Sequence, residues 1–324
     1  MLMSFQETAK FIEDGKLLHI AGTEALLKKL PKGKWVGGST EYFMAKDGSK
    51  ISNEFLFVTE FPYEAFSIKA YSAADIENVA VDAFDNGFSI LIIPFDSAVH
   101  RKYAQNADGF KDMFMKNIVG WISGLNLGVV GQTPIAVRGT DASIYSDEAV
   151  ALHLGLPSNK TARVNIINIF SQDESSPVIT FAEEGFSVTK CFIDGKETVL
   201  ADYIAQNKID IKLPLVGDYA GNGINISFKT IENGVVNFYA PVFNHIQYRI
   251  AKNIEDYEKE FHNKIAGFKE VKTEFSCNCI LNFLHGELEG KNIETFEGPI
   301  TFGEIAYQLV NQTLVYVTTE TQQP

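Results

Sequence analysis

The sequence predicts a mixed α/β protein, in which layered β-sheets are flanked by helices and two halves are related. Three observations predict this class. Strand-like and helix-like segments alternate along the chain, and residues 88–95 form a continuous apolar run typical of a strand covered on both faces. One module of strand, helix, strand and strand occurs twice, beginning at residues 17 and 271. We therefore expect two α/β halves, over residues 1–130 and 131–324.

The first half contains helices marked by caps and apolar stripes. Thr23 is expected to cap one helix, because its hydroxyl can accept a bond from a free backbone N–H. Ser72 is expected to cap another, in which Ile76, Val79 and Ala80 recur at helical spacing. Aromatic and β-branched runs suit a pleated surface and predict strands. In order, we expect a helix over 7–13, a strand over 17–21, the helix after Thr23, strands over 35–39, 54–60 and 65–71, a helix over 72–86, a strand over 88–95 and a helix over 109–121.

The second half is richer in strand signals. Asp194-Gly195 and Glu232-Asn-Gly234 are typical of hairpin turns, where Gly and Asn tolerate a left-handed backbone. The alternating segment from Gly223 is expected to pair with the one from Val235 across the second turn. In order, we expect strands over 134–138, 163–170, 178–182 and 186–193, a helix over 198–207, strands over 223–229 and 235–239, a helix over 254–268 and then the second copy of the module.

The composition excludes several classes of partner. The chain has 324 residues, a net charge of −13 and an isoelectric point near 5.0, which disfavours phosphate backbones and anionic lipid as partners. No apolar run approaches the roughly 20 residues that a membrane-spanning helix needs. Three cysteines do not indicate a disulfide framework. We therefore expect a cytoplasmic protein that binds neither nucleic acid nor membranes.

The repeated module supplies the first candidate ligand contacts. Its second copy contains Gly298-Pro-Ile-Thr-Phe-Gly-Glu-Ile305. A hydroxyl and a carboxylate beside a glycine, which permits close backbone approach, can receive an ammonium or amide group. Thr301, Gly303 and Glu304 are therefore candidates. The alternative is that Gly303 forms a bulge and that Glu304 bonds a neighbouring backbone N–H or an arginine.

Ends of strands provide the other candidates. Ser39 and Thr40, in Gly37-Gly-Ser-Thr40, present hydroxyls where ligands commonly bind in layered α/β folds, or else form a turn or cap. Cys277 and Asn278 end a strand before a helix, whose dipole can lower a thiol pKa, although a free cysteine is more often a small buried side chain. His19 lies on a strand and is equally well explained as a core histidine. Spacing in Cys277-Asn-Cys279 is not that of a zinc site, and no metal is expected.

The second copy resembles the C-terminal part of FIST sensory proteins, a family of intracellular signal-transduction input domains. The first copy is similar to the Gly-Cys-Ser-Thr block of that family, although Tyr42 and Phe43 stand where Gly and Glu are expected. The resemblance implies a small-molecule sensor, with amino acids as a ligand class and a haem-binding gas-sensing branch as a variant. The matching residues are Ser276, Cys277, Gly298, Thr301, Gly303, Glu304, Ile305, Asn311, Thr313, Leu314 and Val315.

We therefore expect a non-enzymatic sensory protein that binds a small molecule, such as an amino acid or similar metabolite, without a cofactor. Its output requires a signalling partner or a homodimer, because no kinase, cyclase or methyl-accepting segment is attached. One alternative is a hydrolase-like enzyme. Its site is then assembled from dispersed residues, because the sequence contains no nucleophile elbow or phosphate loop. Another is a haem-binding gas sensor. His100-Arg101-Lys102 is a basic cluster that can bind an anion or simply face water.

Overall fold

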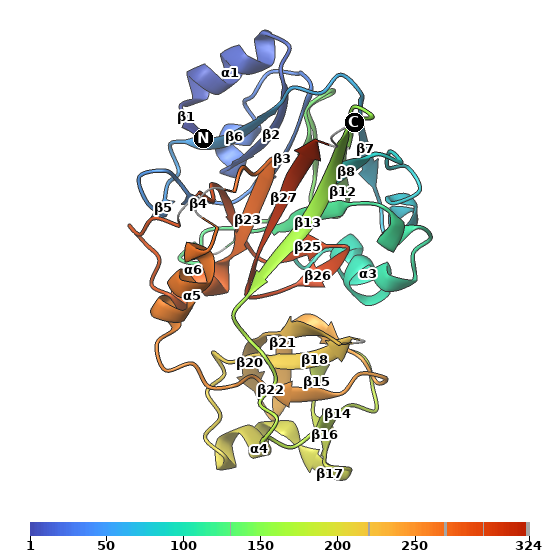
Figure 1. The fold of residues 1–324 in the computed structure, drawn as a ribbon, viewed down its shortest axis with the longest axis vertical. Helices are drawn as coiled ribbons and strands as arrows, with labels where there is room; N and C mark the ends of the chain where they lie inside the picture. The colour runs from blue at the N-terminus through green and yellow to red at the C-terminus, as the bar shows by residue number, and fades with distance from the viewer. Residues whose placement is uncertain (130, 220, 269–270, 294, 322–324) are drawn as a thin grey trace.

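The computed structural model describes residues 1–129, 131–219, 221–268, 271–293 and 295–321. Mixed sheets are flanked by a few helices, so the expected α/β class is confirmed. Figure 1 shows two units. We call the described residues of 1–168 and 257–321 the body, and those of 169–256 the insert. The chain enters the insert at the end of a long strand of the body and returns to the body at a helix.

Three six-stranded sheets of the body share one strand order among the described residues. The first sheet runs β1 (Leu2–Met3), β6 (Leu56–Phe61), β2 (Leu17–Gly22), β3 (Trp35–Ser39), β10 (Ala136–Arg138) and β11 (Ser143–Tyr145). The second runs β7 (Phe66–Tyr71), β12 (Ala149–Gly155), β8 (Gly87–Pro94), β9 (Ile118–Ser123), β25 (Glu304–Ala306) and β26 (Gln308–Val310). The third runs β13 (Lys160–Asn168), β27 (Thr313–Thr321), β23 (Phe275–Cys279), β24 (Gly298–Thr301), β4 (Tyr42–Met44) and β5 (Lys50–Ile51).

The repeated module occurs three times in the described chain, once more than the sequence predicts. Its first strand pairs in parallel with its second strand and antiparallel with its last. The first copy is β2, α2 (Glu24–Leu27), β3 and β6, and the last copy is β23, α6 (Ile280–His285), β24 and β27. The copy that the sequence does not reveal is β8, α3 (Ala98–Asn106), β9 and β12. Two related halves are thus better described as three related copies and an insert.

In each copy, a hairpin precedes the last strand. This hairpin pairs with the sheet of another copy. The hairpin β4–β5 joins the third sheet, β10–β11 joins the first and β25–β26 joins the second. The sheets therefore interlock around a common apolar core, to which all three contribute. The expected limit between the halves, residue 130, lies outside the described residues. Strands on either side of it share sheets, since β10 pairs with β3 and β12 with β8.

Two expected helices of the first half are wrong. Residues 109–121 form a short turn at Met113–Met115 and then β9, and only Ile76–Asn78 of the helix over 72–86 is helical. Residues 118–123 form a strand and not a helix because β9 is buried along its whole length and pairs in parallel with β8. This pairing requires a glycine at position 120, because a Cβ there would lie 1.8 Å from the Leu91 carbonyl oxygen. Helix α3, which carries the basic cluster, was not expected.

The insert contains two sheets. One runs β17 (Lys196–Val199), β16 (Lys190–Ile193), β14 (Ile179–Thr180), β22 (Tyr248–Ile250), β18 (Leu215–Tyr219) and β19 (Asn222–Ile226), and the other runs β15 (Gly185–Val188), β21 (Val235–Val242) and β20 (Phe228–Glu232). Helix α4 (Leu200–Gln206) packs against them. The hairpin turn at Asn233-Gly234 is confirmed by positive φ angles of 52° and 79°. Only β20 pairs across it as expected, because the segment from Gly223 pairs with β18 instead.

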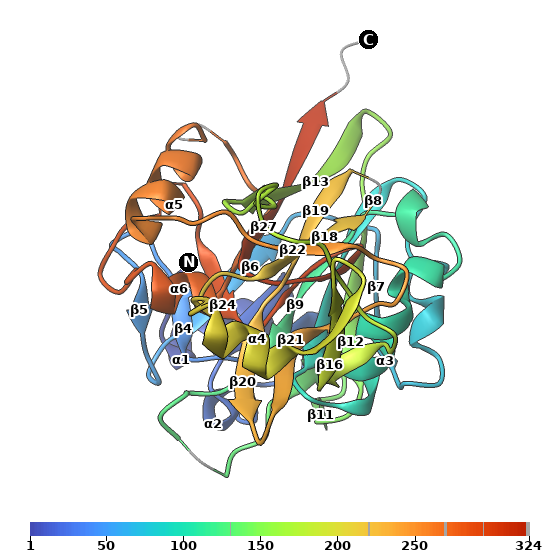
Figure 2. The same ribbon diagram turned by 90° about the horizontal axis from the view of Figure 1, so that it is seen from below.

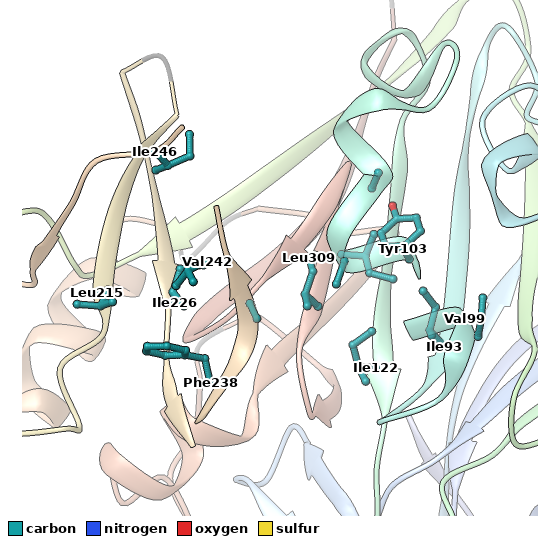
Figure 3. Close-up of a cluster of buried hydrophobic side chains, with 14 of the residues drawn as sticks. Ile93, Val99, Tyr103, Ile122, Leu215, Ile226, Phe238, Val242, Ile246 and Leu309 are labelled. Atoms are coloured by element: carbon teal, nitrogen blue, oxygen red, sulfur yellow. The ribbon is translucent and has the colours of Figure 1, made fainter. Parts of the chain in front are cut away.

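A continuous apolar core fixes the insert to the body. Leu309 of β26 lies between Val242 of the insert and Ile122 of the middle copy (Figure 3). Seen from below, the insert lies in front of the body sheets (Figure 2). The remaining body helices are α1 (Phe5–Glu13) and α5 (Tyr257–Ala266). Within the described residues, no helix combines the length and apolar character needed to cross a bilayer.

Candidate functional site

The three copies meet where their second strands end. The Gly124 N–H donates to the Ser39 carbonyl oxygen at 2.8 Å, and the Phe302 N–H donates to the Ile122 carbonyl oxygen at 3.0 Å. The Thr40 hydroxyl donates to the Ile300 carbonyl oxygen at 2.8 Å. Strand ends from residues far apart in the sequence therefore converge at one place, as the shared topology requires. Ser39 and Thr40 serve this junction, since the Ser39 hydroxyl also accepts from the Ile135 N–H at 2.9 Å.

Glu304 is fully buried beside this junction. The Thr313 hydroxyl donates to Oε2 at 2.7 Å, the Thr301 hydroxyl lies 3.1 Å from Oε1, and the Cys279 thiol also bonds the carboxyl group. Burial raises the pKa of Glu304 to about 8, which keeps it protonated at neutral pH. A protonated Glu304 can donate to Thr301, whose hydroxyl then donates to the Asn278 carbonyl oxygen at 3.2 Å. The carboxyl group is thus satisfied inside the protein.

Gly303 brings two strands together. Its φ of 151° is open to glycine, and its carbonyl oxygen accepts from the Ile122 N–H at 2.9 Å. A Cβ at this position would lie 3.0 Å from Ile122 and 3.1 Å from Leu309. These contacts indicate that a glycine stands at this position because the backbone approaches its neighbours closely.

Cys277 and Asn278 lie on β23 and are fully buried. The Cys277 thiol donates to the Gly120 carbonyl oxygen at 3.4 Å, and burial raises its pKa well above the usual value. A thiolate is therefore disfavoured, and the geometry supports the buried, structural interpretation of this cysteine. The Asn278 side-chain oxygen accepts from Asn282 at 2.8 Å, whereas its Nδ2 finds no partner among the described residues.

His19 lies in the common core of the three sheets. The Trp121 indole N–H donates to its Nε2 at 2.9 Å, and its ring meets Phe275 edge to face at 5.3 Å. Burial lowers the pKa of His19 to about 3, so that the ring is neutral. The interpretation as a core histidine fits these contacts. His19 and Cys277 lie in the core, whereas Ser39, Thr40, Asn278, Thr301, Gly303 and Glu304 lie around the strand ends.

A cavity of about 770 Å³ adjoins the Glu304 cluster, between β13 and β25–β26 of the body and β18–β19 of the insert. We call it the apolar cavity, because its lining includes the apolar and aromatic side chains of Phe114, Ile166, Ile224, Tyr307 and Val310. None of the eight candidate residues lines it. Thr313, however, lies at its wall and also bonds Glu304. Glu304 is therefore one side chain behind a cavity that the insert completes.

A polar seam joins the insert to the body beside this cavity. The side-chain amides of Asn168 and Asn225 bond each other reciprocally, both at 3.0 Å. Asn225 also donates to the Asn311 carbonyl oxygen at 3.0 Å, and the Ser227 hydroxyl donates to the Gln312 side chain at 2.7 Å. Sequence reasoning overlooked these residues of the insert. The polar run from Asn311 to Thr313 in the module is the one signal that pointed to the seam.

The described residues also contain a chain of hydrogen bonds like that of a hydrolase. The Ser89 hydroxyl lies 2.7 Å from His153 Nδ1, and His153 Nε2 lies 2.9 Å from the Tyr71 hydroxyl, which donates to Asp82. A serine activated by a histidine has this arrangement. Ser89 is fully buried within β8, however, and burial lowers the pKa of His153 to about 4. A substrate therefore does not reach this hydroxyl in the described conformation.

Among the described residues, no group of three or more His, Cys, Asp or Glu side chains is placed to hold a metal ion. No curated protein matches the chain. The sequence profile of a family of unknown function, DUF6976, matches residues 3–320, which is nearly the whole chain. The protein therefore belongs to the DUF6976 family.

Proposed function

We propose that this protein binds a small molecule in the apolar cavity between the body and the insert. The observation that carries the proposal is the cavity itself, whose volume of about 770 Å³ lies in the usual range of ligand pockets. Its wall comes from both units, and Thr313 connects it to Glu304, a buried acid with a strongly raised pKa. Apolar walls with a few polar groups beside a perturbed acid are typical of a ligand site.

The charges of the lining favour one class of ligand. The aromatic rings of Phe114 and Tyr307, 6.0 Å apart, and the aliphatic side chains suit a large apolar group. Asp108 contributes a carboxylate, whereas the described lining contains no Lys, Arg or His. A free carboxylate in the ligand would find no cation to pair with. The cavity therefore favours a neutral or cationic metabolite, such as an amino-acid derivative with an apolar side chain and a blocked carboxyl group.

The position of the cavity supports a sensory role, as the resemblance to FIST proteins implies. A ligand that contacts Ile166 of the body and Ile224 of the insert binds best to one arrangement of the two units. Such a ligand shifts the population towards that arrangement. The proposal includes a cytoplasmic location and a receiver of the signal, either a signalling protein or a second copy of the chain. Native mass spectrometry with and without ligand tests the receiver.

The ligand is tested by thermal-shift screening of a metabolite library, followed by calorimetry. A ligand that binds only the native state raises the melting temperature. Ile166→Arg blocks the cavity wall, and Ile144→Arg is the matched control, because these side chains are 46% and 41% exposed on strands of the body. We expect a neutral or cationic apolar compound to stabilise the wild type and the Ile144 variant but not the Ile166 variant. Equal stabilisation of both variants contradicts the proposal.

A further inference from the structure

A second cavity lies between the insert and the middle copy of the module. Its volume is about 440 Å³, and we call it the basic cavity because His100, Arg101 and Lys229 line it. The body contributes the residues just after β8 and the first turn of α3, and the insert contributes β15, β20 and β21. It shares no lining residue with the apolar cavity. A ligand here is thus independent of the proposed function.

His100 has a buried N–H group that lacks an acceptor. The side chain is 3% exposed, and the Asp96 backbone N–H donates to its Nδ1 at 3.2 Å. Because Nδ1 accepts, the neutral ring carries its proton on Nε2. Nε2 has no partner among the described residues. The rings of Phe95 and Phe186, at 5.5 and 5.7 Å, pack against the imidazole ring. The imidazole ring therefore lies at the cavity wall with a buried N–H that has no described acceptor, and buried donors rarely remain without a partner.

The charges around His100 favour an acceptor that is negative. Lys229 lies over the Phe95 ring, with Nζ at 4.8 Å from its centroid, and no described carboxylate pairs with it. Arg101 and Asp96 pair with each other at 2.6 Å, so that their charges compensate. Glu232 also lines the cavity and, like Lys229, is exposed on the hairpin strand β20. Lys229 is thus the basic side chain of the cavity wall that has no ion-pair partner among the described residues.

The walls favour an organic anion over an inorganic one. Phe95, Phe186 and Tyr239 surround the polar groups with aromatic surface. We propose that the basic cavity binds a small organic monocarboxylate, with one carboxylate oxygen accepting from His100 Nε2–H and Lys229 balancing the charge. A single unpaired lysine suits one negative charge, and the aromatic side chains suit a planar or apolar body.

Benzoate is a suitable probe, with benzamide as the neutral analogue of the same shape and inorganic phosphate as an anion without an organic body. Calorimetry and ligand-observed NMR measure the affinity of the full-length chain. We expect saturable binding of benzoate and affinity at least about tenfold lower for benzamide, because a charge-assisted hydrogen bond is lost. Phosphate is expected to bind more weakly than benzoate. Equal affinity for benzamide contradicts the proposal, as does tighter binding of phosphate.

Amino-acid substitutions at the basic cavity test whether benzoate binds there. Lys229→Met removes the charge from an exposed side chain, and Lys196→Met is the matched control on another exposed strand of the insert. We expect benzoate affinity to fall about tenfold or more in the Lys229 and His100→Leu variants and to be unchanged in the Lys196 variant. The Lys229 variant decides the matter if His100→Leu does not fold. Unchanged affinity in the Lys229 variant overturns the proposal and leaves the apolar cavity unaffected.

Discussion

The two cavities at the junction of insert and body differ in how their buried polar groups are satisfied. Beside the apolar cavity, Glu304 is bonded by Thr301, Thr313 and Cys279, and the Asn168 and Asn225 amides bond each other. Beside the basic cavity, His100 Nε2–H has no acceptor among the described residues. A satisfied network stabilises one shape, whereas an unsatisfied donor is completed by something else. The bonded polar groups around Glu304 hold the structure, although Asn278 Nδ2 beside them lacks a described partner. The His100 donor at the basic cavity is the one that we propose a ligand completes.

The most disruptive test of this comparison is Glu304→Ala. It leaves Thr301, Thr313 and Cys279 without their common partner and creates a void, so we expect the free energy of unfolding to fall by about 3 kcal/mol or more. Urea denaturation measures the change. Glu304→Gln keeps the shape and the hydrogen-bonding groups and is expected to cost about 1 kcal/mol or less at neutral pH. A loss below about 1 kcal/mol for the alanine variant means that the network is not structural.

The pH dependence of stability sharpens the same point. The pKa of Glu304 is raised to about 8 in the folded state, above its ordinary value of 4.5. Its stabilising effect is therefore complete below pH 4.5 and is lost as the pH rises towards 8, by about 1.4 kcal/mol per pH unit at most. Wild type should lose stability relative to Glu304→Gln over this window. Urea denaturation at several pH values measures it, and parallel curves for the two proteins would refute the raised pKa.

Buried histidines make the protein less stable as the pH falls, which is the opposite of the effect of Glu304. Burial lowers the pKa of His100 to about 4 from an ordinary value of 6.5. The corresponding stability is present above pH 6.5 and is lost as the pH falls towards 4. His153, whose pKa is also lowered to about 4, contributes with the same sign. Comparing the free energy of unfolding of each variant with that of wild type at the same pH separates these effects from that of Glu304.

A double-mutant cycle at the polar seam has a smaller expected effect. Asn168→Ala and Asn225→Ala each break the reciprocal amide pair that joins body and insert. We expect a coupling energy of about 1 kcal/mol, because the second substitution removes a bond already lost. Urea denaturation of the two single variants and the double variant gives this energy. Strict additivity of the two losses would show that the pair does not hold the insert.

The smallest effect is expected for His100→Leu without ligand. The leucine removes an unsatisfied donor and the acceptor of the Asp96 N–H, which belongs to an exposed residue, so that stability should change by no more than about 1 kcal/mol. His153→Leu is the matched control, because it breaks the bonds to Ser89 and Tyr71 and should cost about 2 kcal/mol or more. Thermal and urea denaturation compare them. Equal losses for the two variants would mean that His100 is as well satisfied as His153.

Local patterns were sufficient to predict much of the fold. The Thr23 cap is confirmed, since its hydroxyl accepts from the Leu26 N–H at 3.2 Å, and the first and last copies of the module have the expected strands. The middle copy remained hidden because residues 109–121 have apolar residues at helical spacing. Pairing with β8 decides their conformation, and that partner is distant in the sequence. The exchange of hairpins between sheets depends on such long-range pairing as well.

The candidate site shows a different limit of sequence reasoning. Residue types suggested Glu304 as a ligand contact and left His100 as a member of a basic cluster. In the structure, Glu304 is bonded by its neighbours, whereas His100 Nε2 has no partner among the described residues, and this difference is why we propose His100 as a ligand contact. Neither property is visible in a local pattern. The insert supplies Lys229 and Tyr239 to the basic cavity, and these residues are distant in the sequence from His100 of α3.

The most direct measurement of this contrast is the imidazole nitrogen NMR spectrum of the ¹⁵N-labelled protein during a benzoate titration. The account predicts that the His100 Nε2–H signal shifts in a saturable way, since benzoate supplies its missing acceptor. The signals of His153, both of whose ring nitrogens have partners, and of His19, which lies in the core away from the basic cavity, should remain in place. A His100 signal that is indifferent to benzoate, or that responds equally to benzamide, would contradict the account.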